Sequence, residues 1–118
     1  MFVFVYGTLK QSKPNHGWIA NEQFMGVGFS CQVTMYKPNS SFPYPFCLLS
    51  DDSDGVYGEV YKVDDEGLKQ LDILEGYPEL YTRDTINVTL EGGKVIEALC
   101  YLLNIKVDTN NFESIIKF

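Results

Sequence analysis

The sequence predicts an α+β fold, in which a mixed, barrel-like sheet carries one main helix. Several segments have the β-branched and aromatic residues typical of strands. Successive strands are mostly joined by turns, and only one segment has the caps and spacing of a well-defined helix. A length of 118 residues is usual for one domain, so residues 1–118 are expected to form a single domain.

The first half of the chain predicts two strands and a short helix. Phe2–Tyr6 alternates aromatic and β-branched residues and is apolar on both faces, so this strand is expected at the centre of the sheet. Trp18–Phe24 follows a polar loop and is compatible with a short helix. A long strand is expected over Phe24–Tyr36, with Gly26 and Gly28 at bulge or bend positions.

The second half predicts the main helix and three further strands. Asp64 is a suitable N-cap for a helix that runs to about Glu75, where Gly76 and Pro78 end it. The tail from Asp108 has only the pattern of a last short strand or helical turn. The strands are expected at Val56–Val63, Tyr81–Leu90 and Val95–Leu103, the last two as a hairpin.

Charge and cysteine content exclude several classes of partner and compartment. The 16 acidic and 9 basic residues give a formal net charge of -7, which argues against a nucleic acid or an anionic membrane as partner. Three cysteines without a CxxC spacing fit a reducing compartment, and neither a disulfide framework nor a zinc site. No apolar run reaches the ~18 residues of a membrane span, and the N-terminal one is too short for a signal peptide. A cytoplasmic protein is therefore expected, with no signal for any particular oligomeric state.

Scarce residue types narrow the chemistry. His16 is the only histidine and lies in a polar loop, where it is expected to be solvated. A metal site with two histidines is impossible within one chain, and any Ser-His-Asp or Cys-His arrangement would have to use His16. Acid–base chemistry is therefore expected from carboxylates.

The first candidate site is the turn Tyr6-Gly7-Thr8-Leu9, which follows the N-terminal strand. Glycine permits a positive φ and the close approach of a ligand to the backbone. Exposed backbone N–H groups in such a turn bind a carboxylate or a developing oxyanion. Many strands end in a glycine turn, so an ordinary tight turn is the alternative interpretation.

The second candidate is Glu75, at the end of the predicted helix. Helical spacing places it on the same face as Leu68 and Leu71, which must face the core. A carboxylate held against apolar surroundings has a raised pKa, which suits acid–base catalysis near neutral pH. The alternative is a solvated glutamate at a fraying helix end.

Further candidates surround the end of this helix. Asp72 shares the inward face and is a candidate partner for Arg83; the sequence favours a structural ion pair for Arg83 over a substrate contact. Tyr81 begins the following strand and is a candidate to line the same cleft. The aromatic run Phe42–Phe46 is expected to pack within its loop, or else to wall a pocket.

Together these segments resemble one family. Phe4–Lys10 (FVYGTLK) is similar to the opening of γ-glutamylcyclotransferase-like proteins. Lys13–His16 (KPNH) is similar to their γ-glutamylamine cyclotransferase branch and its small bacterial relatives. The pattern is completed, in the family's order, by Gly55–Tyr61, Leu71–Pro78 and Tyr81–Arg83, so that the resemblance spans roughly residues 2–103.

The resemblance implies a small mixed α/β barrel with a cavity at its mouth, and no metal or cofactor. It implies that the turn Tyr6-Gly7-Thr8-Leu9 holds a γ-glutamyl group through backbone contacts and that Glu75 is the catalytic acid–base. The substrate would be a small γ-glutamyl amine or γ-glutamyl amino acid, or glutathione as in a more distant branch. Its α-amine would attack its own γ-carbonyl and release 5-oxoproline and a free amine or amino acid.

Two alternatives stay open beside this enzyme. One is the removal of a γ-glutamyl protecting group in a biosynthetic pathway, and the other is a non-catalytic module that binds γ-glutamyl-type ligands. The longer C-terminal segment of the animal enzymes is missing from this sequence, so a more open cavity is expected.

Overall fold

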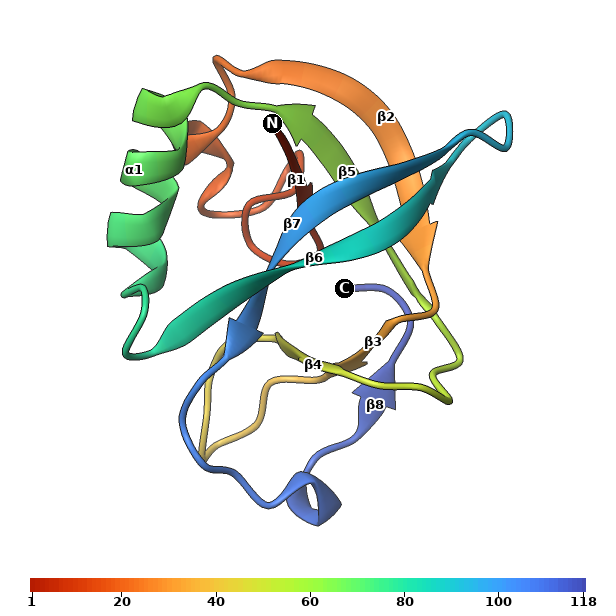
Figure 1. Ribbon diagram of the computed structural model, residues 1–118. Helices are drawn as coiled ribbons and strands as arrows, with labels where there is room; N and C mark the ends of the chain where they lie inside the picture. The colour runs from red at the N-terminus through yellow and green to blue at the C-terminus, as the bar shows by residue number, and fades with distance from the viewer.

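The computed structural model describes all of residues 1–118 and contains a closed five-stranded barrel (Figure 1). The strands follow one another around the barrel in the order β1-β5-β2-β6-β7. β7 runs parallel to β1 and closes the barrel, whereas every other pair is antiparallel. The predicted mixed, barrel-like sheet is thus confirmed. The strands are β1 (Phe2–Val5), β2 (Gln23–Ser30), β5 (Val56–Lys62), β6 (Tyr81–Leu90) and β7 (Val95–Leu103).

A small second sheet lies below the barrel in Figure 1, with the strand order β4-β3-β8. The single long strand predicted over Phe24–Tyr36 is wrong, because the chain leaves the barrel after Ser30 and enters this second sheet at Val33. β4 was not expected from the sequence. For the tail from Asp108 the sequence predicted a short strand or a helical turn, and it forms the short strand β8. The strands are β3 (Val33–Tyr36), β4 (Phe46–Leu49) and β8 (Ser114–Ile115).

The region between β1 and β2 also differs from the prediction. The helix expected over Trp18–Phe24 is absent, and the chain forms one 3-10 turn over His16–Trp18 before β2 begins at Gln23. Phe24 instead packs its ring against Tyr61 of β5, with ring centroids 5.4 Å apart. Pairing with β5 therefore outweighs the local helical preference. A second 3-10 turn covers Thr109–Asn111.

Two glycines of β2 serve different purposes. At Gly26 the register with β5 shifts, and the backbone takes a φ of 134°, which confirms the predicted bulge. Gly28 stays in register, and a Cβ there would lie 2.5 Å from Cγ1 of Val88 on the neighbouring strand β6. Gly28 is therefore required by packing inside the barrel.

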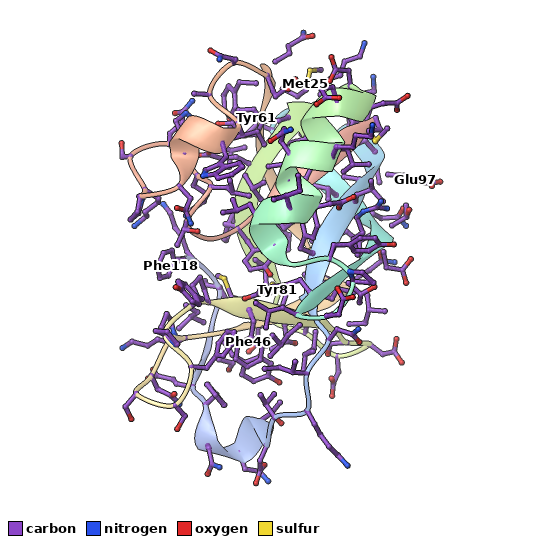
Figure 2. The ribbon with its side chains drawn as sticks, turned by 90° about the vertical axis from the view of Figure 1, so that its left-hand side faces the viewer. Met25, Phe46, Tyr61, Tyr81, Glu97 and Phe118 are labelled. Atoms are coloured by element: carbon purple, nitrogen blue, oxygen red, sulfur yellow. The ribbon has the colours of Figure 1, made fainter.

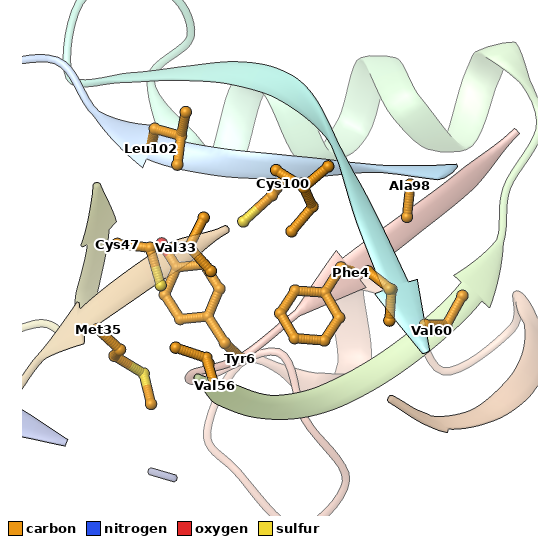
Figure 3. Close-up of a cluster of buried hydrophobic side chains, with 12 residues drawn as sticks. Phe4, Tyr6, Val33, Met35, Cys47, Val56, Val60, Ala98, Cys100 and Leu102 are labelled. Carbon is orange, nitrogen blue, oxygen red and sulfur yellow. The ribbon is translucent and has the colours of Figure 1, made fainter. Parts of the chain in front are cut away.

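Apolar side chains form two clusters, one that extends from the barrel interior to the second sheet (Figure 3) and one that includes the inner face of the helix. β1 supplies both clusters, because Phe4 belongs to the first cluster while Val3 and Val5 belong to the second. Burial on both faces explains why this strand has no polar residue and confirms its central place. Figure 3 shows Tyr6 among the first cluster, beyond Phe4.

The helix α1 (Asp65–Glu75) has the boundaries that its caps predict. The side chain of Asp64 accepts a hydrogen bond from the backbone N–H of Gly67 (2.7 Å). Gly76 adopts the left-handed conformation (φ 63°) and ends the helix. Leu71 anchors the inner face in the second apolar cluster. No helix of the structure is both long enough and apolar enough to cross a membrane.

Candidate active site

A cavity of about 610 Å³ lies where the turn after β1, the end of α1 and the loop before β4 meet. This volume is within the range of roughly 300–1,000 Å³ that is usual for small-molecule sites. The lining residues come from the whole length of the chain: Phe4, Val5, Tyr6, Gly7, Thr8, Leu9, Pro14, Asn15, Pro43, Tyr44, Pro45, Leu74, Glu75, Leu80, Tyr81, Tyr101 and Phe118.

The turn after β1 presents backbone donors without partners. The N–H of Lys10 closes the turn on the carbonyl of Gly7 (3.1 Å). The N–H groups of Gly7, Thr8 and Leu9 donate no hydrogen bond within the chain, although all three residues line the cavity. Unpaired backbone N–H groups of this kind are suited to binding an anionic oxygen.

Gly7 is required here for a different reason from the one its sequence context suggests. Its φ is not positive. A Cβ at this position would lie 2.7 Å from Cγ of Pro45, which belongs to the loop before β4. The absence of a side chain thus lets the turn and this loop form adjoining walls of one cavity.

The polar loop after the turn holds it in place. Asn15 donates two hydrogen bonds to Thr8, from its backbone N–H to the carbonyl (2.9 Å) and from Nδ2 to Oγ1 (2.9 Å). Nδ1 of His16 lies 2.9 Å from the carbonyl oxygen of Leu9, and the ring is half-buried, not solvated. The loop therefore fixes the backbone of a turn that lines the cavity.

Glu75 reaches the cavity from the last turn of α1, facing inward as the helical spacing predicts. Burial alone raises the pKa of its carboxyl to about 7, since no hydrogen bond or charge of the chain offsets the loss of water. The carboxyl is consequently present in both protonation states near neutral pH. A group with this pKa is suited to both accepting and returning a proton.

Asp72 lies one helical turn earlier and is fully engaged. It accepts hydrogen bonds from Nε and Nη2 of Arg83 (2.9 and 3.2 Å) and from the hydroxyl of Tyr101 (2.7 Å). Burial disfavours the charge of Asp72, but the hydrogen bonds from Arg83 and Tyr101 outweigh burial and lower its pKa. The ion pair expected between Asp72 and Arg83 is present, and Arg83 is not among the residues that line the cavity.

Three of the four tyrosines that line the cavity, Tyr6, Tyr81 and Tyr101, donate their hydroxyl protons to other groups of the protein. Tyr6 donates to the carbonyl of Tyr101 (2.8 Å), and Tyr81 donates to the carbonyl of Pro45 (3.2 Å). Burial is the largest cause that raises the pKa of each of these tyrosines above its ordinary value. They remain neutral at physiological pH, so Glu75 is the only lining side chain that changes charge near pH 7.

The structure brings most of the predicted residues together and adds others. Tyr6, Gly7–Leu9, Glu75 and Tyr81 line one cavity. The aromatic run Phe42–Phe46 does both things anticipated for it, because its middle residues wall the cavity while its end rings pack edge to face, 5.7 Å apart. Sequence reasoning did not single out Asn15, Tyr101 or Phe118, and the similarity noted for Lys13–His16 was the only signal that pointed to any of these three.

Comparisons with known proteins give a consistent result. The family model described as "Gamma-glutamyl cyclotransferase, AIG2-like" matches residues 3–116. A Drosophila melanogaster protein named "putative gamma-glutamylcyclotransferase" is 37% identical over 108 residues, covering 86% of this chain and 68% of the relative. The gamma-glutamylaminecyclotransferase of Bos taurus is 33% identical over 101 residues, covering 76% of this chain and 57% of the relative. The crystal structure of an AIG2-like protein from Mus musculus superposes with a TM-score of 0.86 at 26% identity, covering 99% of this chain and 86% of that one.

Proposed function

The chain belongs to the gamma-glutamyl cyclotransferase, AIG2-like family, and on that premise we propose that it converts a small γ-glutamyl amine or amino acid into 5-oxoproline and a free amine. One observation carries the proposal. The carboxyl of Glu75, which has no partner in the chain, shares a cavity with the unbonded backbone N–H groups of Gly7–Leu9.

The reaction needs few groups from the protein. A bond forms between the substrate's α-nitrogen and its γ-carbon, and the bond from the γ-carbon to the leaving nitrogen breaks. An α-ammonium group gives up two protons as it becomes the lactam N–H, and the leaving nitrogen takes both and departs as an ammonium group. Because the nucleophile is part of the substrate, the site has to fold the glutamyl chain into a reactive geometry and move these protons. The reaction as proposed uses no nucleophilic side chain and no cofactor.

Glu75 is proposed to carry these protons. A carboxylate with an ordinary pKa near 4 is a weak base and would accept a proton from an α-ammonium group only with a large uphill step. With its pKa raised to about 7, Glu75 accepts each proton from the α-nitrogen at a lower cost and then returns it to the leaving nitrogen. A positioned acid–base of this kind contributes ~10²–10⁴-fold to a rate.

The turn Gly7–Leu9 is proposed to bind the charged oxygens of the glutamyl group. Attack on the γ-carbonyl places negative charge on its oxygen, and one well-aimed backbone donor stabilises such an oxyanion by about 3–4 kcal/mol. Tyr6 and Tyr81 supply rigid walls, because their hydroxyls are held by main-chain carbonyls. For Arg83 the ion pair with Asp72 favours a role in fixing the end of α1 over a contact with substrate.

Release of 5-oxoproline tests the proposal directly. The purified protein is incubated with γ-glutamyl-ε-lysine, γ-glutamyl-alanine and glutathione, and 5-oxoproline is quantified. We expect product from at least one of the three. Ligand-induced thermal stabilisation without product from any of them would instead support a non-catalytic binding module.

The pH dependence tests the proton carrier. Because the ionised carboxylate accepts the proton, kcat/KM is expected to fall about tenfold for each pH unit below about 7, where Glu75 becomes protonated. A flat profile between pH 5 and 7 would exclude Glu75 as the base.

A further inference from the structure

The cavity has two ends that differ in exposure. Tyr6, Gly7 and Tyr81 are buried and line the inner end, close to the turn whose amides are free. Pro14 and Pro43 line the same cavity but are exposed to solvent, and so they belong to its mouth. A substrate held by the turn therefore directs the group on its γ-carbonyl, the leaving amine, toward the mouth.

The mouth of the cavity is lined by aromatic and proline side chains. Tyr44 lines it with half of its surface exposed (52%), and its ring packs edge to face on Phe42 at 5.9 Å. Two proline rings, Pro14 and Pro43, line the same cavity. These side chains have few rotamers, so an apolar group that enters the mouth orders few of them.

The C-terminal segment supplies the last ring of the mouth. Phe118 lines the cavity, and Figure 2 shows it to the left of Tyr81, below the level of α1. Nζ of Lys10 donates to the backbone oxygen of Phe118 (2.5 Å), and Nζ of Lys13 lies over the Phe118 ring, 4.8 Å from its centre. Both contacts hold Phe118 in place although it is 108 residues from Lys10 in sequence.

No lysine, arginine or histidine lines the cavity, and Glu75 is its only acidic residue. Apart from Glu75, which is assigned to proton transfer, a charge on the leaving amine would thus find no counter-charge among the lining side chains. An aromatic or apolar body would instead find Tyr44 and Phe118, with which aromatic rings pack favourably.

We propose that this mouth is the subsite for the leaving amine and that it selects amines with an aromatic or large apolar body and no additional charge. The inference rests on the proposed function and deepens it, since it assigns the substrate class of the same cavity. The expected substrates are γ-glutamyl amides of arylalkylamines.

A pair of neutral substrates tests the inference. We compare kcat/KM for γ-glutamyl-phenethylamide and γ-glutamyl-methylamide, with γ-glutamyl-ε-lysine as the charged competitor. The wild-type protein is expected to favour the phenethylamide over each of the others by about tenfold or more. Tyr44→Ala and Phe118→Ala are each expected to lower the ratio of phenethylamide to methylamide by about fivefold. Tyr57→Ala, which removes another exposed tyrosine (43%) on β5 outside the cavity, is expected to leave the ratio unchanged.

The outcomes separate the two proposals. Absence of 5-oxoproline from every substrate would overturn the proposed function. Turnover with a ratio near one, a preference for the lysine derivative, or a ratio that survives both alanine variants would overturn the subsite alone. Because each ratio compares two substrates on the same protein sample, a partly unfolded variant does not alter it.

Discussion

Asp72 and Glu75, two carboxylates three residues apart near the end of α1, have pKa values shifted in opposite directions. Asp72 receives three hydrogen bonds from Arg83 and Tyr101, which outweigh its burial and lower its pKa. Glu75 receives none, and burial raises its pKa to about 7. Burial alone does not separate them, because the side chain of Asp72 is itself only 20% exposed. The presence or absence of donors decides which carboxylate stays charged and which one can exchange a proton.

The difference also divides stability from function. Asp72 ties the helix to β6 and β7 through its two partners, so its charge contributes to the folded state. Glu75 loses water without gaining a partner, so its charge opposes folding. A residue that opposes stability and faces a cavity is a common feature of functional sites.

The largest expected effect comes from exchanging each carboxylate for its amide. Glu75→Gln removes the proton acceptor, so kcat for 5-oxoproline release is expected to fall ~10²–10⁴-fold. Asp72→Asn keeps the shape of a residue outside the cavity lining and is expected to lower kcat by less than about tenfold.

Steady-state kinetics of both variants check this prediction, with Glu79→Gln, an exposed glutamate just beyond the helix, as the control. If Glu75→Gln and Asp72→Asn lose activity equally, the different pKa shifts of the two carboxylates do not determine which one acts in catalysis.

The elements that were predicted correctly depend on local signals. The caps of α1, the hairpin turn between β6 and β7, and the apolar strand at the N-terminus each lie within about ten residues of sequence. The inward direction of Glu75 follows from the same helical spacing. These features need no knowledge of the partner segments.

The elements that were missed depend on distant partners. Nothing local separates β2 from β3, because the strand-forming residues continue across Cys31 and Gln32 while the two strands pair with different sheets. Phe118 likewise is placed by distant partners, since it contacts Lys10 and Lys13 at the opposite end of the chain and packs against the first apolar cluster. Tyr101 lies on β7 and is brought to the site by pairing with β6, where it stands opposite Arg83.

The second effect concerns stability as a function of pH. The folded-state pKa of Glu75 is about 7, above its ordinary value of 4.5, so the folded protein binds this proton more tightly than the unfolded chain. The contribution of protonated Glu75 to the free energy of unfolding is therefore fully present below about pH 4.5, and it is lost as pH rises through 7. Glu75→Gln cannot ionise, and it is expected to be about 3 kcal/mol more stable than wild type at pH 9 and equally stable at pH 4.

Urea unfolding at both pH values measures this difference, with Glu79→Gln, at an exposed glutamate, as the control for the substitution itself. A gain of equal size at pH 4 and pH 9 would mean that the amide stabilises the protein by packing and that Glu75 is not desolvated.

A third, smaller effect is expected on the other side of the comparison. Arg83→Met removes two donors from Asp72 and leaves its carboxylate with Tyr101 alone. Hydrogen bonds to a charged group contribute about 1.5–3 kcal/mol, so a loss of about 2 kcal/mol in unfolding free energy is expected at pH 7.

The pH dependence has the opposite sign from that of Glu75. Because the folded-state pKa of Asp72 is lowered, its contribution is present above the ordinary value of 3.8 and is lost as pH falls further. The deficit of Arg83→Met should therefore shrink in acid, as measured by urea unfolding at pH 7 and pH 3. A deficit that stays constant would assign it to the lost packing of the arginine on the ring of Tyr77, where the guanidinium carbon lies 4.3 Å from the ring centre.

The smallest effect concerns the turn Gly7–Leu9, whose backbone N–H groups share the cavity with Glu75. Asn15→Ala removes the hydrogen bond from Nδ2 to Oγ1 of Thr8 but keeps the backbone bond between the same residues. One neutral hydrogen bond contributes about 1 kcal/mol, so kcat/KM is expected to fall about fivefold. Thr8→Val removes the same bond from its other end and should have an equal effect. If Asn15 acts by positioning the turn, the double variant will be no worse than either single one, whereas multiplied losses would mean that Asn15 touches the substrate itself.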